Sequence, residues 1–266
     1  MPLWALAALL LVIVWSYTVG GTLIARRWVL SWPRSENETV GYMLSIAGVA
    51  YAVLLAMIAV GAWNGSSSVD VAVQQEANAL AGVYRGVAGY QPAARAHFQD
   101  LVRDYVDFAV RDEWPALSRD ARSPRTELAS QTLDQELIAY VPTTPNETLL
   151  KPIIVGKLNE FEDARRLRVL TGTKGLDAVT WLVVVLGGMV TIGFTFFFRT
   201  EMFRAQLLLS MLASGMIAVV IFLILAMDHP LWGEVSVQPD ALREVLHAVS
   251  APPSSVTDST QAKILR

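Results

Sequence analysis

The sequence predicts an all-α membrane protein, with four transmembrane helices in two hairpins and a helical extramembrane domain between them. The first observation is composition: 53% of the 266 residues are hydrophobic and only 17% are charged, which is too apolar for an ordinary soluble domain. The second is the helical spacing of apolar residues in the polar middle of the chain, with no sustained period of two. The third is a set of four apolar runs, each longer than 20 residues and free of Asp, Glu, Lys and Arg: 3–25, 40–63, 178–198 and 205–227.

Each of these runs is long enough to be a transmembrane helix, because a span needs about 20 apolar residues. The alternative interpretation of the first run is a secretory signal. The run has no Lys or Arg before it, exceeds the apolar part of a signal peptide in length, and holds no small-residue cleavage site at Gly20-Gly21-Thr22. We therefore predict a retained helix.

The connections within the two hairpins are short, so both lie on one side of the membrane, opposite the N-terminus, the middle segment and the tail. The protein is predicted to be a multi-pass protein of the cell membrane. Its sidedness stays open, because basic residues near the spans are balanced, five against five: Arg26, Arg27, Arg34, Arg199 and Arg204 in the connections, and Arg165, Arg166, Arg168, Lys174 and Arg243 on the other side.

The middle segment, 64–177, is predicted to form four amphipathic helices, which share one core or extend the transmembrane bundle beyond the bilayer. The polar stretch Asn64–Ser68 is expected to end the second span. Pro92 and Ser123-Pro124 mark the starts of two further helices. Thr144–Glu147 matches a capping box, T-x-x-E, at the start of another helix, in which Pro152 is expected to produce a kink.

The chain after the fourth span, 228–249, is predicted to form a turn, a short extended piece at 234–237 and an amphipathic helix. That helix carries Leu242, Leu246 and Val249 on one face. Residues 250–266 are predicted to be a disordered tail because they are rich in Ser, Thr and Pro.

Composition and motifs exclude several kinds of chemistry. The chain has no cysteine, which removes disulfides, thiolate metal sites and cysteine catalysis. It contains no phosphate-binding loop and no hydrolase or zinc-protease motif, so we expect no enzymatic activity, cofactor or metal. A net charge of −3 argues against nucleic acid as a partner. The lipid bilayer is the expected environment.

Small residues at spacings of three and four form a stripe along the second span. Such a stripe lets a neighbouring helix approach closely, or it lines a narrow path in an oligomer. Ser210, Ser214 and Ala218 on the fourth span favour helix packing. The stripe residues are the pore-lining candidates: Gly41, Ser45, Gly48, Ala52, Ala56 and Ala59.

Two arginines fall on the apolar face of the last helix of the middle segment. Arg165 lies four residues after Phe161, and Arg168 three further. A charge at such a position costs several kcal/mol unless it is paired, and a guanidinium binds a carboxylate in two places. We predict that Arg165 or Arg168 pairs with Glu76 or Glu113 inside the helical domain, and the candidate network comprises Glu76, Arg85, Glu113, Arg165 and Arg168.

Four motifs in a fixed order between and after the paired spans suggest a family. They contain Asn78, Trp114, Pro230 and Gly233, and they read EANALAGVYR at 76–85, YVDFAVRDEWPAL at 105–117, ARRLRVL at 164–170 and DHPLWGEVSVQPDALREVL at 228–246. This pattern resembles the bacterial bestrophin-like membrane proteins, catalogued as a domain of unknown function, from the second span to the last helix.

The resemblance implies a homo-oligomer, by analogy with the pentameric bestrophin anion channels, whose pore is lined by the second span. The acidic calcium-binding region of the animal channels has no counterpart in this sequence, so calcium gating is not implied. The resulting hypothesis is an oligomeric channel that conducts inorganic anions. The alternative is a membrane-anchored sensor or scaffold, whose helical middle domain binds a ligand or a partner protein without conduction.

Overall fold

The computed structural model describes residues 3–29, 36–119, 121–198, 202–228, 230–231 and 236–250. The chain forms two compact units. The first comprises residues 1–68 and 171–237, and the second comprises residues 69–170 and 238–266. Among the described residues every regular element is a helix, and four helices are long and apolar enough to cross a membrane. The predicted fold class is confirmed.

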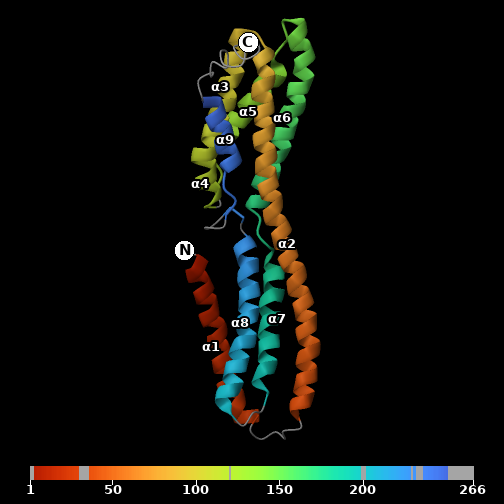
Figure 1. Ribbon diagram of the computed structural model, residues 1–266, viewed down its shortest axis with the longest axis vertical. Coiled ribbons are helices and arrows are strands. Elements are labelled where there is room, and N and C mark those ends of the chain that lie inside the picture. Colours follow the sequence, from red (N-terminus) through yellow and green to blue (C-terminus); the bar gives the residue numbers. More distant parts are fainter. Residues whose placement is uncertain are drawn as a thin grey trace, which may run out of the picture. The chain divides into compact units, whose positions relative to one another are not determined.

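The helices follow the predicted order closely, and they are seen in Figure 1. Two short elements, the 3₁₀ turn η1 (Val87–Gly89) and the π turn η2 (Ala109–Glu113), interrupt the second unit. The α-helices are α1 (Leu3–Val29), α2 (Glu36–Gly86), α3 (Pro92–Phe108), α4 (Trp114–Leu117), α5 (Pro124–Ala139), α6 (Pro145–Gly172), α7 (Ala178–Phe196), α8 (Phe203–Asp228) and α9 (Asp240–Ser250).

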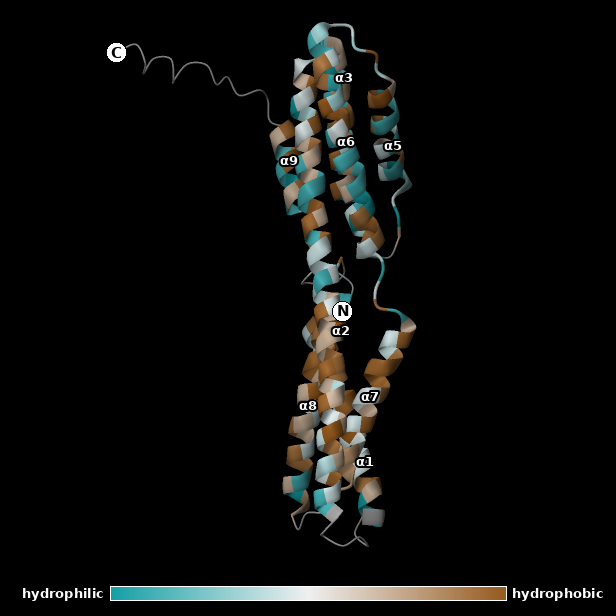
Figure 2. Cartoon of the chain, turned by 90° about the vertical axis from the view of Figure 1, so that its right-hand side faces the viewer, coloured by the Kyte–Doolittle hydropathy of each residue, from teal (hydrophilic) through white to brown (hydrophobic). Residues whose placement is uncertain are grey.

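Unit 1 consists of α1, α7, α8 and the first part of α2, which lie alongside one another in Figure 1 and are the most hydrophobic helices in Figure 2. Polar groups on α1 are satisfied by carbonyls of the neighbouring helices. The Trp15 indole donates to Met211 O at 3.1 Å, and the Tyr17 hydroxyl donates to Met189 O at 3.1 Å. Each bond removes an unsatisfied polar group from the hydrocarbon region, where its cost is high.

Helix α2 packs on α7 through Tyr51. The Tyr51 hydroxyl donates to Val184 O at 2.7 Å, and its ring lies against the backbone of Gly187 and Gly188. A Cβ at Gly187 would come within 2.5 Å of this ring, so glycine permits the close approach. Buried Ser210, Ser214 and Ala218 on α8 confirm that these small residues serve helix packing.

Asp228 ends α8 and ties it to the start of α7. Its carboxylate is buried and accepts hydrogen bonds from Leu176 N and from the Trp181 indole, the latter at 3.1 Å. A carboxylate next to the apolar spans is tolerated because these donors replace its water.

The predicted break at Asn64–Ser68 is wrong, because α2 continues through it as one helix of 51 residues. The Ser68 hydroxyl donates to Asn64 O at 2.7 Å, so this side chain bonds within the helix rather than competing with it. Ala62 and Val69 on either side are buried. Packing on both flanks therefore overrides the low helix propensity of the polar stretch.

Unit 2 is a helical bundle with an apolar core, to which α9 also contributes. Ser123 caps α5 by accepting from Thr126 N at 3.3 Å, and α6 continues through Pro152. Helix α9 buries Leu242, Val245 and Val249 rather than Leu246, which is half-buried. Of the predicted extended piece, 234 and 235 lie outside the described residues, as do residues 251–266 of the predicted tail.

The predicted capping box at the start of α6 is confirmed. Glu147 N donates to Thr144 Oγ1 at 3.2 Å, and the Glu147 carboxylate accepts from Thr144 N at 3.3 Å. The same carboxylate accepts from Thr143 N at 2.7 Å and from Gln91 N at 2.8 Å, next to the start of α3. Bonds from the Thr143 backbone first, and then from Gln91, lower the pKa of Glu147 to about 2.

Replacing Glu147 by glutamine is expected to destabilise unit 2 at neutral pH. The loss of stability relative to the unsubstituted protein is expected to become smaller as the pH falls. A carboxyl with a lowered folded pKa stabilises the fold above its unfolded pKa, and this contribution is lost as pH falls toward its folded pKa of about 2. Thermal melts of both proteins from pH 7 to pH 3 measure the difference in Tm. A difference that stays constant below pH 4 would contradict the assignment.

Candidate functional site

A network of charged side chains lies inside unit 2, where four segments of the chain meet. Helix α2 contributes Glu76, α5 contributes Glu127 and the π turn η2 contributes Glu113, while α6 contributes Arg165 and Arg168. Glu76 and Arg168 are fully buried, and Glu113 and Arg165 nearly so. The structure thus brings both predicted arginines together with both predicted carboxylates: Arg168 pairs with Glu76 and Glu113, and Arg165 pairs with Glu113.

Arg168 holds Glu76 with two hydrogen bonds. Its Nε donates to Oε2 at 2.5 Å, and its Nη2 donates to Oε1 at 3.0 Å. The Tyr105 hydroxyl also donates to Glu76 Oε1, at 2.6 Å. Both oxygens of this carboxylate are therefore satisfied, as a buried charge requires.

Glu113 bridges the two arginines. Its Oε2 accepts from Arg168 Nη2 at 2.7 Å, and its Oε1 accepts from Arg165 Nη2 at 3.1 Å. Arg165 Nη2 also donates to Glu127 Oε2 at 2.9 Å. Glu127 is half-exposed, so the network runs from a dry interior to the surface of the unit.

The π turn η2 places Glu113 in this network. Trp114 N donates to Ala109 O, five residues back, which widens the helix by one residue at this point. Pro115 follows, and it has no N–H to give to the carbonyl four residues before it. Glu113 and Trp114 both turn inward as a result, and the Trp114 ring lies 5.2 Å from the Arg168 guanidinium carbon.

Electrostatics keep the buried Arg168 protonated at neutral pH. Burial alone lowers the pKa of Arg168, but the negative charges of Glu76 and Glu113 outweigh it and raise that pKa well above its usual value. The hydrogen bond from Arg165 lowers the pKa of Glu127. Burial, aided by the charge of Glu76, raises the pKa of Tyr105, which stays a neutral donor.

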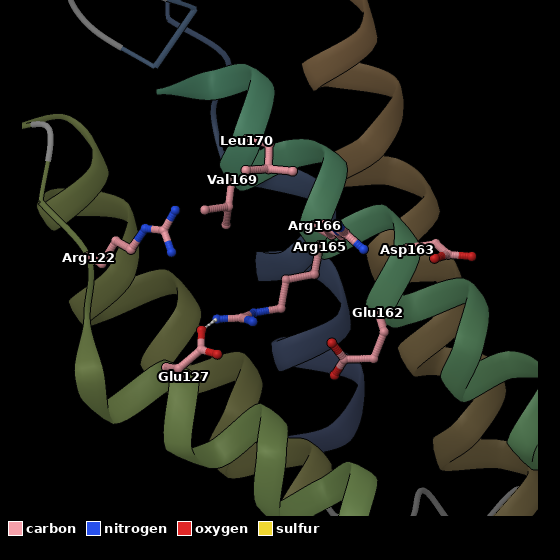
Figure 3. A pocket seen from close by; sticks show the side chains of 8 residues that line it. All are labelled: Arg122, Glu127, Glu162, Asp163, Arg165, Arg166, Val169 and Leu170. Carbon is pink, nitrogen blue, oxygen red and sulfur yellow. Dashed lines mark hydrogen bonds and ion pairs between the residues drawn. The ribbon is translucent and has the colours of Figure 1, made fainter. Parts of the chain in front are cut away.

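A pocket of about 420 Å³ lies over the exposed end of the network, between α5 and α6 (Figure 3). Figure 3 shows the Arg165 side chain reaching from α6 to Glu127, which stands on the opposite wall. Glu162 also lines the pocket; burial raises the pKa of its carboxyl, which accepts from Ser130 at 2.7 Å. The pocket walls carry both signs of charge and two apolar side chains, Val169 and Leu170.

The small-residue stripe lies on a face of α2 that none of the other described helices covers. Apart from the adjoining backbone of α2 itself, no described atom lies within 4 Å of the position that a Cβ would take at Gly41 or Gly48, and Ser45, Ala52 and Ala56 are exposed. At 3.6 residues per turn the packing face of α2 lies to one side of this stripe, with Tyr51, Leu55 and Ala62 in the core cluster. Ala59, at the edge, packs partly on that cluster.

Large apolar side chains occupy the third face of the membrane part of α2. Ile46, Val53, Met57 and Val60 are each more than half exposed. Exposed large apolar groups on a span suit contact with lipid tails. The stripe is therefore distinct both from the helix-packing face and from this apolar face.

The remaining candidates lie elsewhere. Arg85 is exposed and lines another pocket with Glu244; it follows Glu76 by nine residues, which is half a turn away on the helix. Asn78 is exposed, Trp114 and Pro230 are buried, and Gly233 lies outside the described residues.

Sequence reasoning missed two members of the network, Tyr105 and Glu127. Tyr105 lies among the buried apolar residues of α3, where nothing in the sequence indicates a partner for its hydroxyl. Glu127 follows the capping Ser123 in the first turn of α5, a place where a carboxylate is favoured by the helix dipole alone. A local pattern therefore gave no signal of the contact with Arg165.

Each residue of the network makes at least one ion pair or hydrogen bond, although the buried Arg165 Nε and Arg168 Nη1 have no hydrogen-bond partner among the described residues. This geometry stabilises structure rather than activating a nucleophile. Among the described residues, no group of three or more His, Asp or Glu side chains could hold a metal ion. What the network does is join α2, η2, α5 and α6. It holds α2 and α6 together close to the points where each passes between the two units.

The four helical spans and the helical second unit define an integral membrane protein of the all-α class. A family model described as a bestrophin-like domain matches residues 12–242. The chain therefore belongs to the bestrophin-like family.

Solved structures agree with this membership. One variant of a bacterial bestrophin homologue from Klebsiella pneumoniae is 11% identical, with a TM-score of 0.70 over 92% of this chain and 99% of that chain. Another variant is 14% identical, with a TM-score of 0.67 over 91% and 99%. At such identity the likeness concerns the fold. No curated protein is similar enough in sequence to match.

Proposed function

We propose that this chain is a subunit of an oligomeric ion channel of the cell membrane, which conducts anions through an axial pore lined by the membrane part of α2. The observation that carries the proposal is the uncovered small-residue face of α2, with Gly41, Ser45, Gly48, Ala52 and Ala56. Four helices are too few to enclose a wide pore. A ring of copies would turn this face toward a common axis, and the resemblance to bestrophins favours five.

The chemistry of the face suits a pore that holds ions weakly. The stripe has small side chains and no charge, and the second span carries no Asp, Glu, Lys or Arg over 40–63. An apolar constriction of this kind gates by dewetting. The choice of anions rests on the resemblance to the bestrophins.

Reconstitution of the purified chain into planar bilayers tests the proposal. We expect currents whose reversal potential follows the gradient of the anion and not that of the cation. The oligomeric state of the detergent-solubilised protein is measured in parallel, and we expect a closed ring of about five copies. Silence with every anion and voltage, together with a monomer or dimer, would instead support the sensor or scaffold hypothesis.

A further inference from the structure

Three arginines gather at one end of the spans of unit 1, although they are far apart in sequence. Arg26 and Arg27 are in the last turn of α1, and Arg204 is in the first turn of α8. Both helix ends lie at the same end of unit 1 (Figure 1). The Arg26 guanidinium carbon stands 4.4 Å from the centroid of the Phe203 ring, next to Arg204.

These cations have no counter-ion within the described part of the chain. None of the ion pairs there involves Arg26, Arg27 or Arg204. Glu38, in the first turn of α2 at the same end, is exposed and pairs with none of them. Arg27 and Arg204 are exposed, and Arg26 is half-buried.

The position of Arg204 is electrostatically unfavourable without an anion, whereas Arg26 and Arg27 lie in the last turn of α1, where the helix dipole favours cations. Arg204 lies in the first turn of α8, where the helix dipole is positive and disfavours a cation. That turn contains no acidic residue. The stacking of Arg26 on Phe203 adds a second positive charge beside it. A bound anion would reduce both repulsions.

The surroundings identify the anion as part of a lipid. Above the arginines, the outer faces of α1 and α8 are apolar and exposed: Leu23, Ile24, Leu208 and Leu209 are each more than half exposed. An anionic phospholipid fits both the positive charge and the apolar surface, because its phosphate can bind the arginines while its acyl chains lie along these side chains. We propose that the cluster of Arg26, Arg27 and Arg204 binds the phosphate headgroup of an anionic phospholipid. This inference does not depend on conduction.

Thermal melts of the full-length protein in detergent test the proposal. Phosphatidylglycerol, phosphatidylcholine or inorganic phosphate is added, and Tm is followed by tryptophan fluorescence. We expect phosphatidylglycerol to raise Tm by about 4 °C more than phosphatidylcholine does, and inorganic phosphate to have little effect. Equal effects of the two lipids would overturn the proposal. An effect of inorganic phosphate equal to that of phosphatidylglycerol would indicate a site for free anions and overturn the lipid assignment.

Variants locate the effect. The double variant Arg26→Gln/Arg204→Gln is expected to lose most of the response to phosphatidylglycerol. Arg95→Gln, an exposed arginine on α3 of unit 2, is the matched control and is expected to keep it. Arg204→Gln alone leaves the contact of Arg26 with Phe203 in place, so this single variant can be measured if the double variant does not fold. We expect it to keep about half of the rise in Tm that phosphatidylglycerol produces. Full retention in the double variant, or in Arg204→Gln alone, would overturn the proposal.

Discussion

Replacing Arg168 by methionine is expected to lower the free energy of unfolding of unit 2 by about 3–5 kcal/mol, the cost of leaving buried carboxylates without their partner. Glu76 would lose both bonds from the guanidinium, and Glu113 would lose one of two. Both carboxylates are almost inaccessible to water. Thermal and denaturant unfolding of the purified protein measure the loss.

The matched control is Arg166→Met, because Arg166 is exposed and forms no ion pair within the described residues. Its effect is expected to stay within about 0.5 kcal/mol, as for most surface changes. Adding Glu76→Gln to Arg168→Met should recover part of the stability, since it removes one unpaired buried charge. If Arg168→Met were as stable as Arg166→Met, the network would not hold unit 2 together.

A cysteine at Ala52 is expected to make the proposed channel sensitive to a charged thiol reagent. The protein has no cysteine of its own, so a single introduced thiol is the only target. In Ala52→Cys, a negatively charged methanethiosulfonate places a bulky charge in a narrow, uncharged path. We expect the anion current to fall on the order of tenfold, because both size and charge oppose the ion.

Met57→Cys is the control for this experiment. Met57 is 72% exposed on the large apolar face of α2, away from the stripe. The anion current of Met57→Cys is therefore expected to stay unchanged after addition of the reagent. A current that falls in Met57→Cys and persists in Ala52→Cys would assign the pore to the other face of α2. Insensitivity at both positions would remove the membrane part of α2 from the conduction path.

Helix positions and the membrane class could be predicted from the sequence because they depend on local patterns. Four charge-free apolar runs fix the spans whatever their neighbours are, and the capping groups at Ser123 and Thr144 mark helix starts by bonds within one turn. The burial of Arg165 and Arg168 could also be predicted, because they lie on an apolar helix face. A buried arginine needs a partner of opposite charge, so the pairing could be predicted as well.

Other features depended on contacts that no local pattern encodes. The helix through Asn64–Ser68 persists because buried residues on both sides hold it, against its own propensity. The π turn before Pro115 decides where Glu113 points.

By itself, then, the sequence determined the class of the protein, the spans and the need for buried counter-charges, since periodicity and charge are local properties. Only the tertiary structure decided which carboxylates pair with the arginines, and it added Glu127 to the network. It placed Arg85, a predicted member, at the surface. It also brought Arg26 beside Phe203 and left the small-residue face of α2 uncovered. These outcomes depend on how helices distant in sequence pack together, which the periodicity of a single helix does not specify.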